Sequence, residues 1–172
     1  DIYISFDMAA FSSSLAAVAA KRIWLSALND YLQAKYYRAE IAGLHYRIYG
    51  HQAGFTIHTR GFTEQQTLLV NQLLDAVTAF SPTQKSFEHY KELQLQSLQN
   101  SLLNKPTNRL FSRLSVLIQR NTQAPIELLD AVTHSTYEAM LATCKDAFSH
   151  YYVDSFMHGN WSLEHANTFA DA

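Results

Sequence analysis

The sequence predicts an α+β fold in which one antiparallel sheet is covered on one face by helices. Two consecutive runs, at 44–49 and 55–60, alternate apolar and polar residues around a short glycine-containing stretch, which is typical of a β-hairpin. Several helix-period segments then follow one another without an intervening strand, and single strands are predicted near both ends of the chain. This order favours a sheet with its helices segregated to one side.

The composition indicates one ordinary domain and excludes several kinds of site. A chain of 172 residues can bury about two thirds of its unfolded surface in one core. The single cysteine, Cys144, excludes intramolecular disulfides and zinc sites built on paired cysteines, and we expect it to be a small buried residue rather than a nucleophile. The formal net charge of −2 and the scattered basic residues predict neither a nucleic acid nor a membrane as partner.

The spacing of apolar residues predicts a strand at the start of the chain and then a long helix. Ile2, Ile4 and Phe6 alternate with polar residues, which predicts a strand with one buried face. The serines at 12–14 can cap a helix that we expect to end at about Gln33, because its apolar residues recur at helical spacing.

The hairpin has one apolar and one polar face. The apolar set is Leu44, Tyr46, Ile48, Phe55, Ile57 and Thr59, and the polar set is His45, Arg47, Tyr49, Thr56, His58 and Arg60. Placing both apolar sets on one side predicts a register with Ile48 opposite Phe55, Arg47 opposite Thr56 and His45 opposite His58. Gly50 to Gly54 would form the loop.

Capping signals divide the rest of the chain into helices. Thr63 and Gln66 form a capping-box pattern, Ser81 and Pro82 open a third helix, and Pro106 marks its end. A fourth helix, with apolar residues from Leu110 to Leu117, is broken by the stretch NTQAP, and a short helix restarts at 126–132.

The last part of the chain predicts a helix, a strand and another helix. Ser135 and Glu138 predict the start of a helix that reaches about His150. The stretch YYVDSFMHGN predicts a returning strand, and Ser162 starts a final helix. Because the chain opens within a strand and stops within a helix, we expect residues 1–172 to be a single domain excised from a longer protein.

Four stretches together resemble the pitrilysin and insulin-degrading enzyme family of zinc metallopeptidases. They are YYRAEIAGLHYRIYGHQAGFTIHTRGFTEQQTLLVNQLLDAV, SFEHYKELQLQSLQN, ELLDAVTHSTYEAM and FMHGNWSLEHA. In that family similar stretches occur in the same order in the third of four related domains. The resemblance implies a fold like that of LuxS and mitochondrial processing peptidase, with an antiparallel sheet and helices on one face.

The zinc chemistry of the family depends on a His-x-x-Glu-His motif in the first domain, and this chain lacks the motif. Its corresponding first helix, SLAAVAAKRIWLSALNDYL, contains no histidine or glutamate. In HYKEL, His89 and Glu92 have the right spacing, but Leu93 stands where the second histidine would be, so we expect His89 to be a structural or surface residue. The resemblance therefore implies no catalytic, metal-binding or cofactor-binding residue here, and zinc in the first domain of the parent enzyme.

The resemblance also implies a role for the polar face of the hairpin. Domains of this family enclose a chamber with their sheets turned inward, so His45, Arg47, His58 and Arg60 would be wall residues facing a bound peptide. Two alternatives remain at this point. The face can simply be solvated, as antiparallel sheets often are on one side, or His45 and His58 can share a zinc ion across the strands.

The sequence thus predicts a non-catalytic domain of a zinc metalloendopeptidase, inactive by itself, which helps to enclose peptide and docks against neighbouring domains. The alternative is a freestanding inactive peptidase-like interaction protein. Isolated from its neighbours, the domain would expose an apolar patch and is expected to self-associate. The sequence assigns no compartment, and a bacterial parent of this kind would be periplasmic or cytoplasmic.

Overall fold

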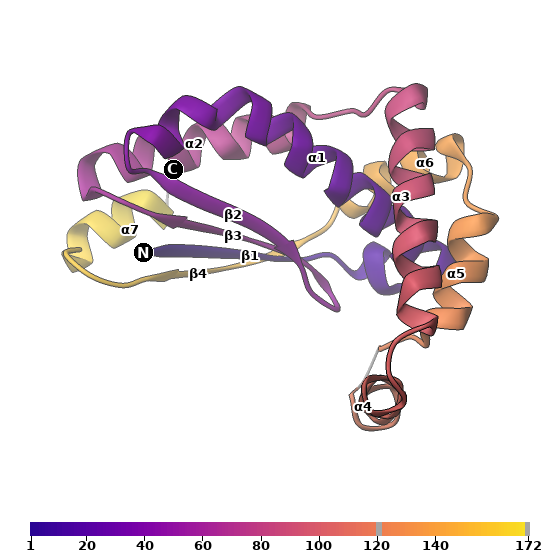
Figure 1. Cartoon of the computed structure of the whole chain (residues 1–172). Helices are drawn as coiled ribbons and strands as arrows, with labels where there is room; N and C mark the ends of the chain where they lie inside the picture. The colour runs from indigo at the N-terminus through magenta and orange to yellow at the C-terminus, as the bar shows by residue number, and fades with distance from the viewer. Residues whose placement is uncertain (120–121, 171–172) are drawn as a thin grey trace.

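The computed structural model describes residues 1–119 and 122–170 and contains one four-stranded sheet with its helices (Figure 1). Residue 121, which begins the predicted break NTQAP, and residues 171–172 of the predicted last helix lie outside the described residues. The strands are β1 (Ile2–Asp7), β2 (His45–Gly50), β3 (Gly54–Arg60) and β4 (Tyr152–Met157). The helices are η1 (Ala9–Ser12), α1 (Leu15–Ile41), α2 (Thr63–Ala79), α3 (Gln84–Leu102), α4 (Pro106–Ile118), α5 (Pro125–Thr133), α6 (Tyr137–Ala147) and α7 (Leu163–Ala170).

The predicted fold class is confirmed. The strand order is β2-β3-β1-β4, and every neighbouring pair is antiparallel. In Figure 1, α1 and α2 lie above the sheet, α3, α5 and α6 form a second group beside it, and α4 projects from that group. No described element covers the lower face of the sheet in this view.

The core lies between the sheet and α1, with Trp24 at its centre. Ile2, Ile4 and Phe6 of β1 are buried, as their alternation predicts, and Phe55 and Ile57 of β3 are fully buried. The indole of Trp24 is 1% exposed. Its ring packs against the rings of Phe11, Phe55, Phe80 and Phe148 at centroid distances of 5.6–6.1 Å.

The first helix begins as predicted but continues well beyond Gln33. Ser14 caps α1, and its hydroxyl oxygen accepts a hydrogen bond from the Ala17 amide at 3.1 Å. The helix reaches Ile41 through a non-helical residue, Tyr36, whose ring is buried and whose hydroxyl donates to the Gln72 carbonyl at 2.8 Å. The helix end predicted at about Gln33 was therefore wrong. The contact with α2 that accompanies the extra turns joins residues far apart in the sequence, and local spacing cannot reveal it.

The predicted capping box at Thr63 and Gln66 is not formed. Helix α2 does start at Thr63, but its N-cap residue, Phe62, makes no side-chain capping bond. The Gln66 side chain is 1% exposed, and its amide donates to the carbonyl and the hydroxyl oxygen of Thr59 at 2.7 and 3.0 Å. Gln66 therefore joins α2 to β3 instead of closing the helix start.

The start and the end of the third helix were both predicted a few residues away from where they lie. Thr83 caps α3 by accepting from the Ser86 amide, while the buried Pro82 accepts from the Tyr137 hydroxyl through its carbonyl. The third helix ends at Leu102, and Pro106 is the first residue of α4.

Helix α6 is shorter than predicted at both ends. Thr136 caps it, and the predicted cap, Ser135, donates its hydroxyl to the Ala131 carbonyl of the preceding helix. The helix ends at Ala147 rather than near His150. Neighbouring hydroxyl residues can each act as a cap, so local sequence does not choose between them.

The hairpin has the predicted faces but a different register. Ile48 lies opposite Ile57, Arg47 opposite His58 and His45 opposite Arg60, two residues away from the predicted pairing. A shift of two residues leaves every side chain on its own face, so alternation cannot distinguish the two registers. Gly50 and Gly54 belong to the strands, and only residues 51–53 form the loop.

Apolar side chains are exposed on α4. No residue of this helix is buried, and its large apolar residues include Leu110, Phe111, Leu117 and Ile118, each at least 66% exposed. This surface is where the expected self-association would occur, and self-association stays a prediction. Among the described residues, no helix is both long enough and apolar enough to cross a membrane.

Candidate functional site

The uncovered face of the sheet holds the side chains that alternate with the core residues. On β1 they are Tyr3, Ser5 and Asp7, because Ile2, Ile4 and Phe6 point to the helices. The pairing of β3 and β4 with β1 brings Thr56, His58 and Phe156 to the same face. This face is therefore formed by all four strands rather than by the hairpin alone.

A row of four side chains crosses this face from one edge strand to the other. Arg47 on β2 lies opposite His58 on β3, His58 opposite Tyr3 on β1, and Tyr3 opposite Phe156 on β4. The rings of Tyr3 and His58 are stacked at a centroid distance of 4.1 Å and an angle of 4°. The rings of Tyr3 and Phe156 are 6.2 Å apart. The row combines a cation with three flat rings, and flat rings pack readily on peptide side chains.

His58 contributes little positive charge to this face at neutral pH. Its Nε2 atom lies 3.0 Å from the Asp1 carboxylate. Partial burial, with smaller contributions from Arg47 and Arg60, lowers the pKa of His58 below its ordinary value of 6.5. The neutral ring can donate its N–H to the carboxylate. The positive charge of the row therefore rests on Arg47, and Arg60 adds a second exposed cation to the same face.

The structure does not bring His45 and His58 together as partners. His45 lies opposite Arg60, and Arg47 occupies the position opposite His58, so the direct cross-strand pairing on which the hypothesis of a shared zinc ion rested was wrong. Within residues 1–119 and 122–170, no three histidine, cysteine, aspartate or glutamate side chains cluster closely enough to hold a metal ion.

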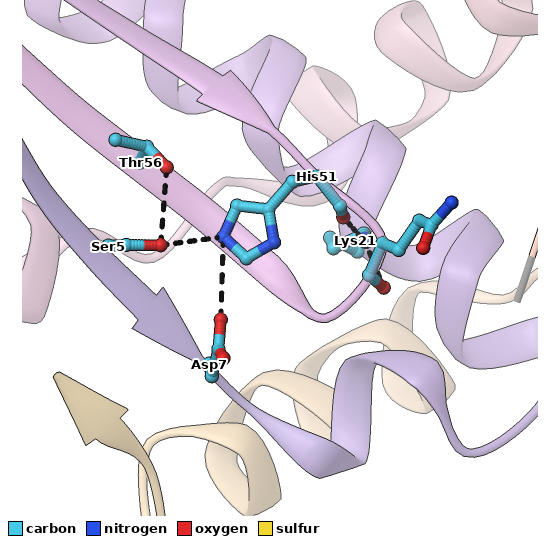
Figure 2. A network of polar contacts seen from close by, with 6 residues as sticks. Ser5, Asp7, Lys21, His51 and Thr56 are labelled. Atoms are coloured by element: carbon cyan, nitrogen blue, oxygen red, sulfur yellow. Dashed lines mark hydrogen bonds and ion pairs between the residues drawn. The ribbon is translucent and has the colours of Figure 1, made fainter. Parts of the chain in front are cut away.

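A second polar cluster lies on the same face where the hairpin loop meets β1 (Figure 2). The Nε2 atom of His51 is 3.2 Å from the Ser5 hydroxyl and 3.7 Å from an oxygen of the Asp7 carboxylate. The Thr56 hydroxyl lies 3.4 Å from that of Ser5. Serine, histidine and aspartate thus meet here, which raises the question of a catalytic triad.

The geometry of this cluster is not that of a triad. A triad needs the serine at one ring nitrogen and the carboxylate at the other, so that the carboxylate orients a ring that removes the serine proton. In Figure 2, the lines from Ser5 and Asp7 end at the same nitrogen of His51. One nitrogen cannot accept from serine while donating to aspartate. The cluster therefore connects the loop to β1 and does not activate a nucleophile.

Lys21 holds the same loop from the helix side. The residue is 5% exposed, and its ammonium donates to the carbonyl oxygens of His51 and Gln52. Burial, together with the charge of the neighbouring Arg22, lowers the pKa of Lys21 from 10.5 to about 8. A neutral amine retains two N–H groups, so it can still donate to both carbonyls.

This lowered pKa predicts a pH-dependent stability. Between pH 8 and 10.5, Lys21 holds its proton in the unfolded chain and loses it in the folded chain, so its contribution to the free energy of unfolding should rise with pH. We expect wild type to gain on the order of 2 kcal/mol relative to Lys21→Met from pH 7.5 to pH 10. Urea unfolding of both proteins measures this difference, and parallel pH profiles would contradict the prediction.

The remaining predicted residues lie away from this face. Cys144 on α6 is 8% exposed, and burial raises the pKa of its thiol to about 12, which agrees with a small buried residue and not with a nucleophile. His89 and Glu92 are exposed on α3, which agrees with a surface role for His89.

The alternation of the hairpin predicts its polar residues on this face, and four of them, His45, Arg47, His58 and Arg60, were the predicted wall residues. Five other residues of the face were missed. Tyr3, Ser5 and Asp7 could have been found in the same way, since they alternate with the predicted core residues of the first strand. His51 and Phe156 could not, because the loop conformation and the β1–β4 pairing bring them to the face.

Comparisons with known proteins agree along most of the chain. The family model described as the middle or third domain of peptidase M16 matches residues 1–149. Insulin-degrading enzyme of Drosophila melanogaster is 34% identical over 143 residues, which are 83% of this chain and 14% of that protein. The A-factor-processing enzyme of Saccharomyces cerevisiae is 24% identical over 165 residues, which are 96% of this chain and 16% of that protein.

The fold is shared with pitrilysin. The crystal structure of pitrilysin matches with a TM-score of 0.87 at 16% identity, covering 99% of this chain and 18% of pitrilysin. The curated relatives described above are likewise much longer, since this chain spans 14% and 16% of their lengths.

Proposed function

Because this chain belongs to the peptidase M16 family as a middle or third domain, we propose that it is a non-catalytic part of a zinc metalloendopeptidase. In this proposal it forms one wall of a peptide-enclosing chamber and docks against neighbouring domains of the same polypeptide. The observation that supports the wall is the sheet face that no described helix covers, which presents Arg47, Arg60, Tyr3 and Phe156.

The residues present do not fit a catalytic zinc ion. The stretch at 14–32, where the family places its metal-binding helix in the catalytic domain, contains neither histidine nor glutamate. His51 and His58 each approach one aspartate, and none of the described residues completes a three-ligand group. Zinc in this proposal belongs to the first domain of the parent enzyme.

The first test uses the chain alone. We expect the purified chain to retain less than stoichiometric zinc after dialysis and to leave a quenched peptide substrate uncleaved, because it has no third metal ligand. Metal analysis and a fluorescence assay measure the two quantities. One tightly held zinc per chain, or cleavage that a chelator abolishes, would overturn the assignment of a non-catalytic domain.

The second test addresses the wall in the parent protein. Replacing both Arg47 and Arg60 with glutamate should lower kcat/KM for peptides with acidic residues remote from the scissile bond. The loss should be about fivefold per acidic contact at low ionic strength, which corresponds to about 1 kcal/mol for a solvated pair, and it should shrink with added salt. The zinc content of the enzyme should not change, and neither should its turnover of a short neutral peptide.

A charge-matched control separates this effect from net charge. Arg38 on α1 and Lys85 on α3 are exposed and lie away from the sheet face, so their replacement by glutamate changes the net charge by the same amount. The control should leave the selectivity between acidic and neutral peptides at its wild-type value. Equal selectivity in both double variants would mean that the sheet face is merely solvated.

The alternative function is a freestanding interaction protein with this fold and no peptidase activity. The exposed apolar residues of α4 are consistent with it, because a separate protein partner would cover them just as a neighbouring domain of the same polypeptide would. A His-x-x-Glu-His motif encoded upstream in the same reading frame supports the peptidase, and a reading frame limited to this domain supports the interaction protein.

A further inference from the structure

A cavity of about 450 Å³ lies on the helix side of the hairpin loop. Its described walls are formed by α1, the loop after β2, α3 and α5, together with Gln119, Thr122 and Gln123. The volume is within the range of about 300–1,000 Å³ that small-molecule sites occupy. Among its described lining residues, His51 also contacts the uncovered sheet face, and the proposed chamber wall of Arg47, Arg60, Tyr3 and Phe156 uses none of them.

The cavity contains two cations and no carboxylate among its described lining residues. Lys21 is almost fully buried, and two of the three N–H groups of its ammonium meet backbone carbonyls. The next residue, Arg22, is exposed and lines the mouth of the cavity, and its guanidinium makes no hydrogen bond to any residue that the structure describes. A buried cation is normally paired with an anion, and Lys21 meets only carbonyl oxygens, so it lacks the expected counter-charge.

The polar side chains of the wall are held in place by hydrogen bonds to one another. The Gln52 amide donates to the Thr122 hydroxyl at 2.9 Å, and that hydroxyl donates to the Gln119 side-chain oxygen at 3.3 Å. The Gln94 amide on α3 donates to the Ser26 hydroxyl on α1 at 2.8 Å. The wall is therefore polar and ordered around the two cations rather than an apolar gap.

From this geometry we infer that the cavity binds a small molecule through an oxyanionic group, a phosphate or a carboxylate, paired with Arg22 and Lys21. A guanidinium fits the two oxygens of such a group, and the remaining N–H of the ammonium supplies a second charged donor. The inference does not depend on the peptidase assignment, because none of the proposed wall residues Arg47, Arg60, Tyr3 and Phe156 lines the cavity.

Anion binding in this cavity should be linked to proton uptake. The titratable groups among the described lining residues are Lys21 and Arg22 on α1 and His51 on the loop, and α3 and α5 contribute none. The pKa of Lys21 is about 8 without an anion, and a bound anion would raise it. Binding at pH 8.5 should therefore take up a fraction of one proton from the buffer.

Isothermal titration of the chain with inorganic phosphate and with succinate, at an ionic strength fixed by chloride, tests the inference. We expect one site that binds phosphate or succinate more tightly than chloride. If phosphate binds more tightly, the natural ligand carries a phosphate, and if succinate does, it carries a carboxylate. Arg22→Gln should weaken binding at least tenfold. Arg38→Gln, an exposed change on the same helix outside the cavity, should not weaken it.

The proton uptake is measured by repeating the titration at pH 8.5 in two buffers with different ionisation enthalpies. Wild type should show uptake and Lys21→Met should not. Because Lys21 also holds the loop, Arg22→Gln, which removes no described hydrogen bond of the side chain, decides the outcome if the lysine variant does not fold. Binding no stronger than that of chloride, or equal affinity of Arg22→Gln and wild type, would overturn the inference.

Discussion

Replacing Gly54 with alanine is expected to lower the free energy of unfolding by about 3 kcal/mol or more. A β-carbon at this position would overlap the carbonyl oxygen of Phe6 and would lie 3.0 Å from the Phe6 carbonyl carbon and 3.4 Å from the Met8 nitrogen. All three atoms belong to the backbone of the neighbouring segment, which pairs with β3 through Asp7 and Gly54. The clash can be relieved only by separating β1 from β3, because no side chain can rotate away.

Gly50→Ala provides the matched control. A β-carbon there would meet the end of the Leu25 side chain, Cδ1, at 2.9 Å, and that group can change rotamer. We expect a loss of about 1 kcal/mol or less in this variant. Urea unfolding followed by circular dichroism compares the two variants. If both lose a similarly small free energy of unfolding, β1 can move away from β3 at little cost, which would contradict the prediction. A shift of β1 should also disturb the contacts of Ser5 and Asp7 with His51.

Replacing Trp24 with alanine is expected to cost about 3–5 kcal/mol. The side chain is 1% exposed and contacts aromatic rings from η1, β3 and the segments that follow α2 and α6. Its removal would leave a cavity where the sheet meets both groups of helices, and those four rings cannot all move inward. A loss of this size is a large part of the total stability of an ordinary domain, about 5–15 kcal/mol, so partial unfolding at room temperature is expected.

Trp24→Phe is the control for Trp24→Ala, since it keeps a ring among the four neighbours and removes less volume. We expect it to lose clearly less stability than the alanine variant. Thermal unfolding should be followed by far-ultraviolet circular dichroism, because both substitutions remove one of the two tryptophans that would report by fluorescence. A melting temperature of Trp24→Ala within a few degrees of wild type would mean that the core collapses around the missing ring.

The sequence was sufficient for features that depend on near neighbours along the chain. Alternation in the first strand and in the hairpin assigned Ile2, Ile4, Ile48 and Ile57 to the buried face, because successive side chains of a strand point to opposite sides. The order of strands and helices determined the α+β class, and the hairpin alternation placed Arg47 and Arg60 on the polar face.

The tertiary structure alone decided which residues meet across elements. The hairpin register could shift by two residues without moving any side chain to the other face, so the opposition of Arg47 and His58 had to come from the paired strands. Gln66 binds Thr59 on β3 and does not form the predicted capping box. Tyr36 binds Gln72 on α2, in the part of α1 that continues beyond the predicted end. Lys21 lies 30 residues before the loop carbonyl that it binds. Contacts over such distances depend on the packing of whole elements, and no local pattern in a single sequence specifies them.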